Sequence, residues 1–190
     1  MAKRYKIGRT EEQIWSDFEA VAITPYDTLG APRVGVDEAA TNWAKAQYPA
    51  LAQPSASLEA YLTEMRGFRV LDLVPKCDGI PVYGNGRAYS GIDLYTFRGK
   101  CLEWCKSVLT KSLLNEAWEE HNPDQLLSYG NKLADSARVF AEKNATTEWL
   151  SLRDPPEADE GPSHETHVVI SAAKWCRFWG ERGHGLEPYF

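Results

Sequence analysis

Three of the chain's four histidines, His164, His167 and His184, lie near its C-terminus. Three imidazoles, with or without a carboxylate such as Glu165 or Glu187, form a ligand set that zinc and other borderline metals accept. With one coordination position left open to water, such a centre would be hydrolytic. The spacing from His164 to His167 is one residue shorter than the His-Glu-x-x-His pattern of zinc helices. The residues therefore indicate a candidate zinc site whose convergence depends on the fold.

Glycines flank the last histidine, in the order Gly183-His184-Gly185. They free the backbone around an imidazole that could act as a general base or contact a ligand near neutral pH. A structural interpretation competes with this one, because Gly183 suits the residue that follows a helix and a cation is favourable near a helix C-terminus. The spacing favours the structural interpretation.

A thiol nucleophile at Cys77 is a further hypothesis. Cys77 stands in an expected loop, Lys76 beside it would favour the thiolate, and His167 or His184 could accept the proton. No known thiol-enzyme pattern surrounds this cysteine. The other three cysteines, at positions 101, 105 and 176, fall on apolar helix faces and are expected in the core.

Aromatic and arginine residues near the C-terminus have the composition of a protein-binding surface. Trp175, Phe178 and Trp179 crowd one expected helix and cannot all point inward. A second region, around Gly84-Asn85-Gly86, has backbone that a ligand can approach closely. The candidate partner-binding residues are Trp179, Arg177, Arg182, His184, Tyr83 and Arg87. The alternative is a C-terminal helix that is buried on most sides.

Two long amphipathic helices are expected to position these residues. Apolar residues recur at three and four positions over about 93–120 and again over 123–143. Asn122 and Pro123 mark the start of the second helix as N-cap and first helical residue. Such a short connection predicts an antiparallel helix hairpin.

Strands are expected at 68–74, which is rich in β-forming residues, and at 167–171, which is apolar at Val168, Val169 and Ile170. The second strand would lead into a last helix, from Ala172 to about Arg182. Further expected elements are helices over 11–22, 38–47 and 58–65, a hairpin at Asn85-Gly86 and an extended piece at 146–152. The predicted fold class is α+β: a helix-rich single domain, 1–190, with the helix hairpin packed on a small sheet. The segments 24–36, 75–90 and 153–165 are expected to be loops.

Composition limits the partners and the compartment. The net charge of -6 disfavours nucleic acid and anionic membrane, and suits another protein as partner, with a basic protein as one option. An apolar run of the ~18 residues that cross a bilayer is missing from the sequence, as is the apolar core of a signal peptide. The four cysteines lack disulfide-framework spacing, so a cytoplasmic protein is expected.

The leading functional expectation is a non-enzymatic protein-interaction module, similar in profile to immunity proteins and adaptors as a class. The alternative is a metal-dependent hydrolase that uses His164, His167 and His184. The chain contains none of the glycine-rich patterns that bind phosphates, which disfavours nucleotide-dependent chemistry.

Overall fold

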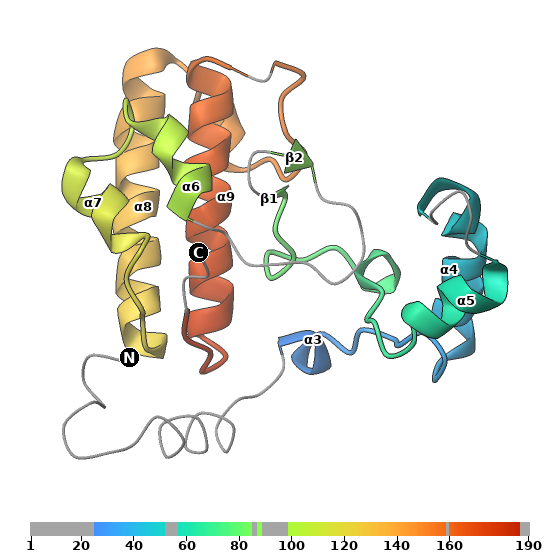
Figure 1. The fold of residues 1–190 in the computed structure, drawn as a ribbon. Coiled ribbons are helices and arrows are strands. Elements are labelled where there is room, and N and C mark those ends of the chain that lie inside the picture. Colours follow the sequence, from blue (N-terminus) through green and yellow to red (C-terminus); the bar gives the residue numbers. More distant parts are fainter. Residues whose placement is uncertain (1–24, 52–56, 85–86, 89–98, 159, 187–190) are drawn as a thin grey trace, which may run out of the picture. The chain divides into compact units, whose positions relative to one another are not determined.

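A computed structural model describes residues 25–51, 57–84, 87–88, 99–158 and 160–186 (Figure 1). The contacts divide the chain into two compact units. The N-terminal unit contains the described residues from 25 to 77, and the C-terminal unit contains those from 78 to 186. The helix expected over 11–22 lies outside the described residues, and the single domain expected from chain length stays a prediction.

The N-terminal unit is built from short helices around a small apolar core. Its helices are α3 (Pro25–Thr28), α4 (Glu38–Leu51), α5 (Leu58–Glu64) and the 3-10 helix η1 (Leu71–Leu73). The core consists of Val34, Ala40, Ala44, Tyr61 and Val70. The helix expected over 38–47 is present but longer, because a proline near a helix end removes only a hydrogen bond of the last turn.

The strand expected at 68–74 is wrong. Only its first residues pair, where the Val34 amide donates to the Phe68 carbonyl at 2.9 Å and the Val70 amide to the Pro32 carbonyl at 2.8 Å. The chain then turns into η1. Val70 and Leu71 are both buried, at 0% and 2% exposure, whereas neighbours in a strand point to opposite faces. Burial of two successive side chains favours the 3-10 turn over the strand.

Two long antiparallel helices organise the C-terminal unit, α8 (Pro123–Asn144) and α9 (Pro162–Gly180), which lie side by side (Figure 1). The start of α8 is confirmed as predicted: the Asn122 side chain accepts from the Gln125 amide at 2.9 Å and the Gln125 side chain accepts from the Asn122 amide at 3.0 Å. At the other end of the pair, the hydroxyls of Thr146 and Thr166 lie 2.8 Å apart. The capping box therefore fixes where α8 begins, and the two threonine hydroxyls connect the residues after α8 to α9.

The prediction that α8 pairs with one long helix over 93–120 is wrong. The segment expected as one helix over 93–120 contains, in its described part, α6 (Gly99–Leu102), the 3-10 helix η2 (Glu103–Cys105) and α7 (Lys111–Glu116). Thr110 interrupts the helical run, because its hydroxyl accepts from the Leu113 amide at 3.4 Å and starts a new helix. Short helices therefore replace the long helix that was expected to pair with α8, and α9 lies along α8 instead (Figure 1).

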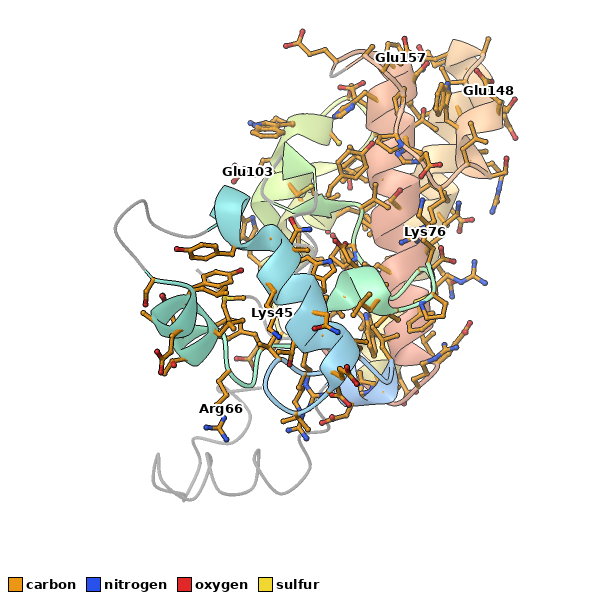
Figure 2. All side chains as sticks on the ribbon, turned by 90° about the vertical axis from the view of Figure 1, so that its right-hand side faces the viewer. Lys45, Arg66, Lys76, Glu103, Glu148 and Glu157 are labelled. Carbon is orange, nitrogen blue, oxygen red and sulfur yellow. The ribbon has the colours of Figure 1, made fainter. Side chains whose placement is uncertain are left out.

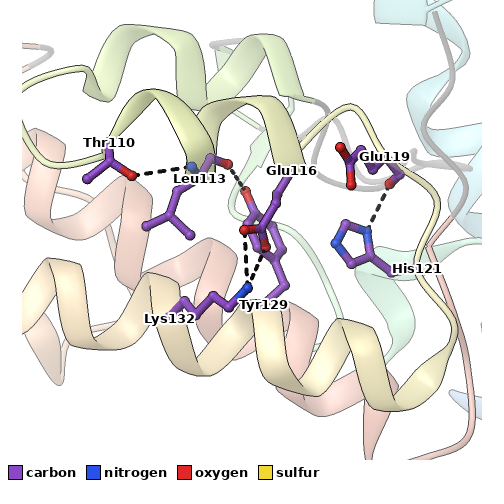
Figure 3. A network of polar contacts seen from close by, with 7 residues as sticks. All are labelled: Thr110, Leu113, Glu116, Glu119, His121, Tyr129 and Lys132. Atoms are coloured by element: carbon purple, nitrogen blue, oxygen red, sulfur yellow. Dashed lines mark hydrogen bonds and ion pairs between the residues drawn. The ribbon is translucent and has the colours of Figure 1, made fainter.

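Polar contacts join α7 to α8 near His121, the histidine that lies outside the C-terminal group of three (Figure 3). The Tyr129 hydroxyl donates to the Leu113 carbonyl at 3.0 Å, and Lys132 pairs with Glu116 at 2.9 Å. The His121 ring stacks on Tyr129 with centroids 5.0 Å apart, and its Nδ1 donates to the Glu119 carbonyl at 2.8 Å. Burial lowers the pKa of His121, so this imidazole acts as a neutral packing and hydrogen-bonding group.

The strand expected at 167–171 is also wrong, because these residues belong to α9. Every residue from Thr166 to Ala173 is buried, so this part of the helix is covered on all sides. A fully buried helix segment and a buried strand have the same continuous apolar pattern. Strands among the described residues are limited to β1 (Tyr83–Gly84) and β2 (Arg87–Ala88), which pair antiparallel. The fold is helix-rich, and the predicted α+β class with a small sheet is wrong.

The connection between α8 and α9 also differs from expectation. The piece expected to be extended at 146–152 contains the 3-10 helix η3 (Thr147–Leu150). The loop expected over 153–165 ends at Gly161, since Pro162 already opens α9. None of the helices in the described ranges is long and apolar enough to cross a membrane.

The crossing of α8 and α9 leads to a stability prediction. A Cβ atom at Gly130 would lie 3.0 Å from Cys176 Cβ and 3.1 Å from the Ala173 carbonyl oxygen. Gly130→Val should therefore force the helices apart and lower the free energy of unfolding by about 1–3 kcal/mol. Urea unfolding measures this change. The control is Asn131→Val on the exposed side of α8, which should change stability by less than about 0.5 kcal/mol; equal effects of the two variants would contradict the crossing.

Candidate functional site

One face of α9 carries a row of polar residues that we call the polar stripe: His164, His167, Ser171 and Lys174. Spacings of three and four place these side chains on the same side of a helix. Residues 78–83 and 149–153 contact the stripe through several of the bonds described below. Among the described residues of the C-terminal unit, the polar stripe is the group of titratable side chains that most resembles a functional site.

At the centre of the stripe, His167 is held by Tyr83. The Tyr83 hydroxyl lies 2.6 Å from His167 Nδ1, and both residues are buried. When the hydroxyl donates to Nδ1, the proton of the neutral ring is carried on Nε2. The Tyr83 ring meets His164 and His167 edge-on, each at a centroid distance of 5.5 Å. Trp149, from η3, meets the other side of His167 at 6.1 Å.

Burial decides the protonation state of His167. It lowers the pKa of this imidazole to about 4, assisted by electrostatic interactions with Lys174 and His164. Backbone groups of Leu152 and Arg153 raise the pKa of His167, but by less than burial lowers it. His167 Nε2 makes no hydrogen bond of ordinary geometry with the residues that the structure describes. The imidazole is therefore neutral at pH 7 and acts as an acceptor for Tyr83.

Further along α9, the stripe borders a small hollow lined by Asp78, Ile80, Val82, Leu152, Arg153, Ser171 and Lys174. Its cavity volume is about 10 Å³, close to that of a single water molecule. Lys174 Nζ donates to the Leu152 carbonyl at 3.3 Å, and Arg153 Nη2 donates to the Ile80 carbonyl at 3.2 Å. Arg153 also faces Asp78 at 3.7 Å. Burial lowers the pKa of Lys174, Arg153 lowers it further, and Asp78 raises it.

The structure brings together two of the three predicted metal ligands and separates the third. His164 and His167 lie in the first turns of α9, whereas His184 follows its other end. The 19 residues of α9 span about 28 Å. Within the described ranges, no group of three His, Cys, Asp or Glu side chains is placed to hold a metal ion. The convergence that a metal site at His164, His167 and His184 requires is therefore not found, because one continuous helix replaces the expected strand and shorter helix.

His184 belongs to the end of α9. Gly183 takes a left-handed φ of 77°, and the His184 amide donates to the Trp179 carbonyl at 3.0 Å. The imidazole packs edge-on against Trp179 with centroids 4.9 Å apart, and burial lowers its pKa. These contacts agree with the structural interpretation of Gly183 and His184.

The aromatic candidates for partner binding are mostly internal. Trp179 is only 2% exposed, and its Nε1 donates to the Gly79 carbonyl at 3.0 Å. Arg182 lies over the Phe178 ring at 3.6 Å and donates to the Phe178 carbonyl at 2.9 Å. Arg177 is exposed, and the Arg87 side chain lies outside what the structure describes. The Trp179 ring therefore packs inside the unit, whereas Arg177 and Arg182 are exposed.

Three of the four cysteines are buried where the helical pattern of the sequence predicts it. Cys101, Cys105 and Cys176 are buried as predicted, and burial raises the pKa of both Cys105 and Cys176 to about 12. These thiols are therefore inert near neutral pH. Cys77 is half-buried at the end of the N-terminal unit, and its role as a nucleophile stays a prediction.

Sequence reasoning missed Trp104, which is 60% exposed. The helical pattern allowed either Trp104 or Cys105 on the apolar face. Cys101 and Cys105, at 2% and 1% exposure, occupy that face and leave Trp104 outside. The four-residue spacing of the two cysteines was the signal that could have identified it.

The chain matches no protein-family model, and comparison with curated proteins and with solved structures gave no match.

The buried His167 should make stability depend on pH. The unfolded imidazole binds its proton near pH 6.5 and the folded one near pH 4, so the unfolded state holds more protons between these values. The stabilising effect is complete above about pH 6.5 and is lost as the pH falls toward 4. Lowering the pH from 7 to 5 should cost about 2 kcal/mol through this group.

Denaturant unfolding at both pH values tests this expectation. His167→Gln should remove most of this part of the pH dependence. Tyr83→Phe is the matched control, because it removes the hydroxyl bonded to His167 Nδ1 but keeps the buried imidazole. It should lower stability by about 1–3 kcal/mol and retain most of the pH dependence. Equal pH dependence in His167→Gln and in the unmodified protein would refute the assignment.

Proposed function

We propose that the protein is a non-enzymatic module that binds another protein through a surface centred on Trp104. The observation that carries the proposal is the 60% exposure of this indole. A tryptophan is on average highly buried, and at interfaces it is among the residues that contribute most to binding. An exposed indole in a compact helical unit is therefore best explained by a partner that covers it.

The support beneath Trp104 is rigid. The neighbouring residues Cys101, Leu102 and Cys105 are 2%, 3% and 1% exposed and anchor α6 and η2 in the core. Such anchoring fixes the backbone that carries the ring, which reduces the entropy that binding would otherwise cost. The backbone of a contact surface centred on Trp104 is thus in place before a partner binds.

The acidic character of the chain favours a basic partner. Glu103 adjoins Trp104 and is exposed, and Glu148 and Glu157 are exposed at the end of the unit where α8 leads into α9 (Figure 2). Together with the net charge of -6, these carboxylates would speed the approach of a positively charged surface. A metal-dependent hydrolase lacks comparable support, since the late histidines lie at opposite ends of α9.

Trp104→Ala tests the proposal. The variant should weaken partner binding by more than about 2 kcal/mol, roughly thirtyfold, if the indole is the centre of the interface. It should change the free energy of unfolding by less than about 0.5 kcal/mol, because the ring is exposed. Val139→Ala is the control, since Val139 is 68% exposed on α8 and belongs to no proposed surface.

The partner is first isolated by affinity capture with the full chain and then purified. Isothermal titration calorimetry then compares the two variants with the unmodified protein at two salt concentrations. A basic partner should bind more weakly at the higher salt concentration. A stoichiometric partner that binds Trp104→Ala as tightly as the unmodified protein would contradict the proposed surface.

A further inference from the structure

The hollow beside the polar stripe gathers positive charge and hydrogen-bond donors. Two cations, Arg153 and Lys174, line it together with Ser171 and one carboxylate, Asp78. Both cations come from rigid surroundings: Lys174 and Ser171 lie on α9, and Arg153 is bonded to the Ile80 carbonyl at 3.2 Å. The group of charges is therefore held in place before any ligand arrives.

Donors remain for a ligand. The Lys174 ammonium has three N–H donors, of which the bond to the Leu152 carbonyl uses one. Ser171 adds a hydroxyl from one turn earlier on the same face of α9. The neighbouring wall is apolar, formed by Ile80, Val82 and Leu152. Apolar walls around a few polar groups strengthen charge-assisted hydrogen bonds.

Charge and size select the class of ligand. Two cations and one carboxylate leave the lining with one net positive charge, which a monoanion neutralises. A cavity volume of about 10 Å³ admits a group about as large as a water molecule. One oxygen of a carboxylate can enter a hollow of this size while the rest of the ligand stays outside it, and the single charge of a carboxylate matches the lining, whereas sulfate carries two charges. Burial lowers the pKa of Lys174, Asp78 raises it and Arg153 lowers it, so the carboxylate of Asp78 offsets only part of the effect of burial.

The geometry points to a carboxylate-binding pocket formed by Ser171, Lys174 and Arg153, in which Asp78 competes with the ligand for Arg153. The ligand is a carboxylate group, supplied by a small organic acid or by an acidic side chain. This pocket goes beyond the proposed function and does not depend on Trp104.

Titration of the full chain with acetate tests the pocket. Backbone amide NMR signals of Ser171, Lys174 and Arg153 should shift in a saturable way. Methyl acetate, which is neutral and of similar size, should produce no saturable shift. Lys174→Gln should weaken acetate binding about tenfold, because it removes a charge-assisted hydrogen bond.

A second variant, for which the opposite change in acetate binding is expected, makes the test selective. Asp78→Asn removes the competing carboxylate and should strengthen acetate binding about threefold. Asp78 is half-exposed, so this variant stays informative even if Lys174→Gln unfolds. Arg138→Gln is the matched control: Arg138 is an exposed cation on α8 that pairs only with Asp135 in the described contacts, and its replacement should leave acetate binding unchanged.

The source of the carboxylate is read from a second probe, a capped tripeptide with one glutamate. Tighter binding of the tripeptide than of acetate supports a carboxylate carried by a protein, and tighter binding of acetate supports a small acid. Three results would overturn the pocket: no saturable shift with either probe, tighter binding of sulfate than of acetate, or weaker acetate binding in Asp78→Asn. Trp104→Ala should bind acetate normally, which separates this test from that of the proposed function.

Discussion

The close approach of α8 and α9 is the constraint on which the C-terminal unit depends. Gly130 faces Ala173 and Cys176, and Gly180 faces Leu127, at distances that leave no room for a side chain. Helices that approach through glycine bring long stretches of backbone together and bury the side chains on either side of the contact. Once this crossing is made, the remaining faces of α9 must be covered by other segments, because Thr166 to Ala173 are all buried.

Burial of α9 on every side creates a problem for its polar residues, and their surroundings show how it is met. His167 is fully buried and stays neutral, with the Tyr83 hydroxyl bonded to its Nδ1 at 2.6 Å. Lys174 donates to the Leu152 carbonyl, and the half-exposed Asp78 offsets part of the lowering of its pKa by burial. A buried polar group is costly when it is left without a partner. Tyr83 removes this cost for His167 Nδ1, whereas His167 Nε2 and His164 Nδ1 are buried without a hydrogen-bond partner in the described part of the chain. The same arrangement concentrates donors at the hollow.

Local signals predicted local structure well. Asn122 and Pro123 identified the start of α8, because the signals for a helix start lie within a few consecutive residues. The structure adds that Asn122 and Gln125 form a capping box there. The burial of Cys101, Cys105 and Cys176 followed from helical spacing. The errors occurred where the local pattern fits two structures. The apolar run from Val168 to Ile170 suits a buried strand or a buried helix equally, and the period over 93–120 ran through Thr110, which caps a separate helix.

The amino-acid order was enough to predict where α8 begins, that α5 forms, which thiols are buried and which residue types could do chemistry. Each of these depends on neighbours within about one helical turn. Long-range packing is the reason that α9 is a single helix paired with α8, that His184 lies at the opposite end from His164 and His167, and that Trp104 is exposed while Trp179 is buried. These outcomes depend on which face of a helix another segment covers, and contacts between residues far apart in the chain leave no periodic signal in the sequence.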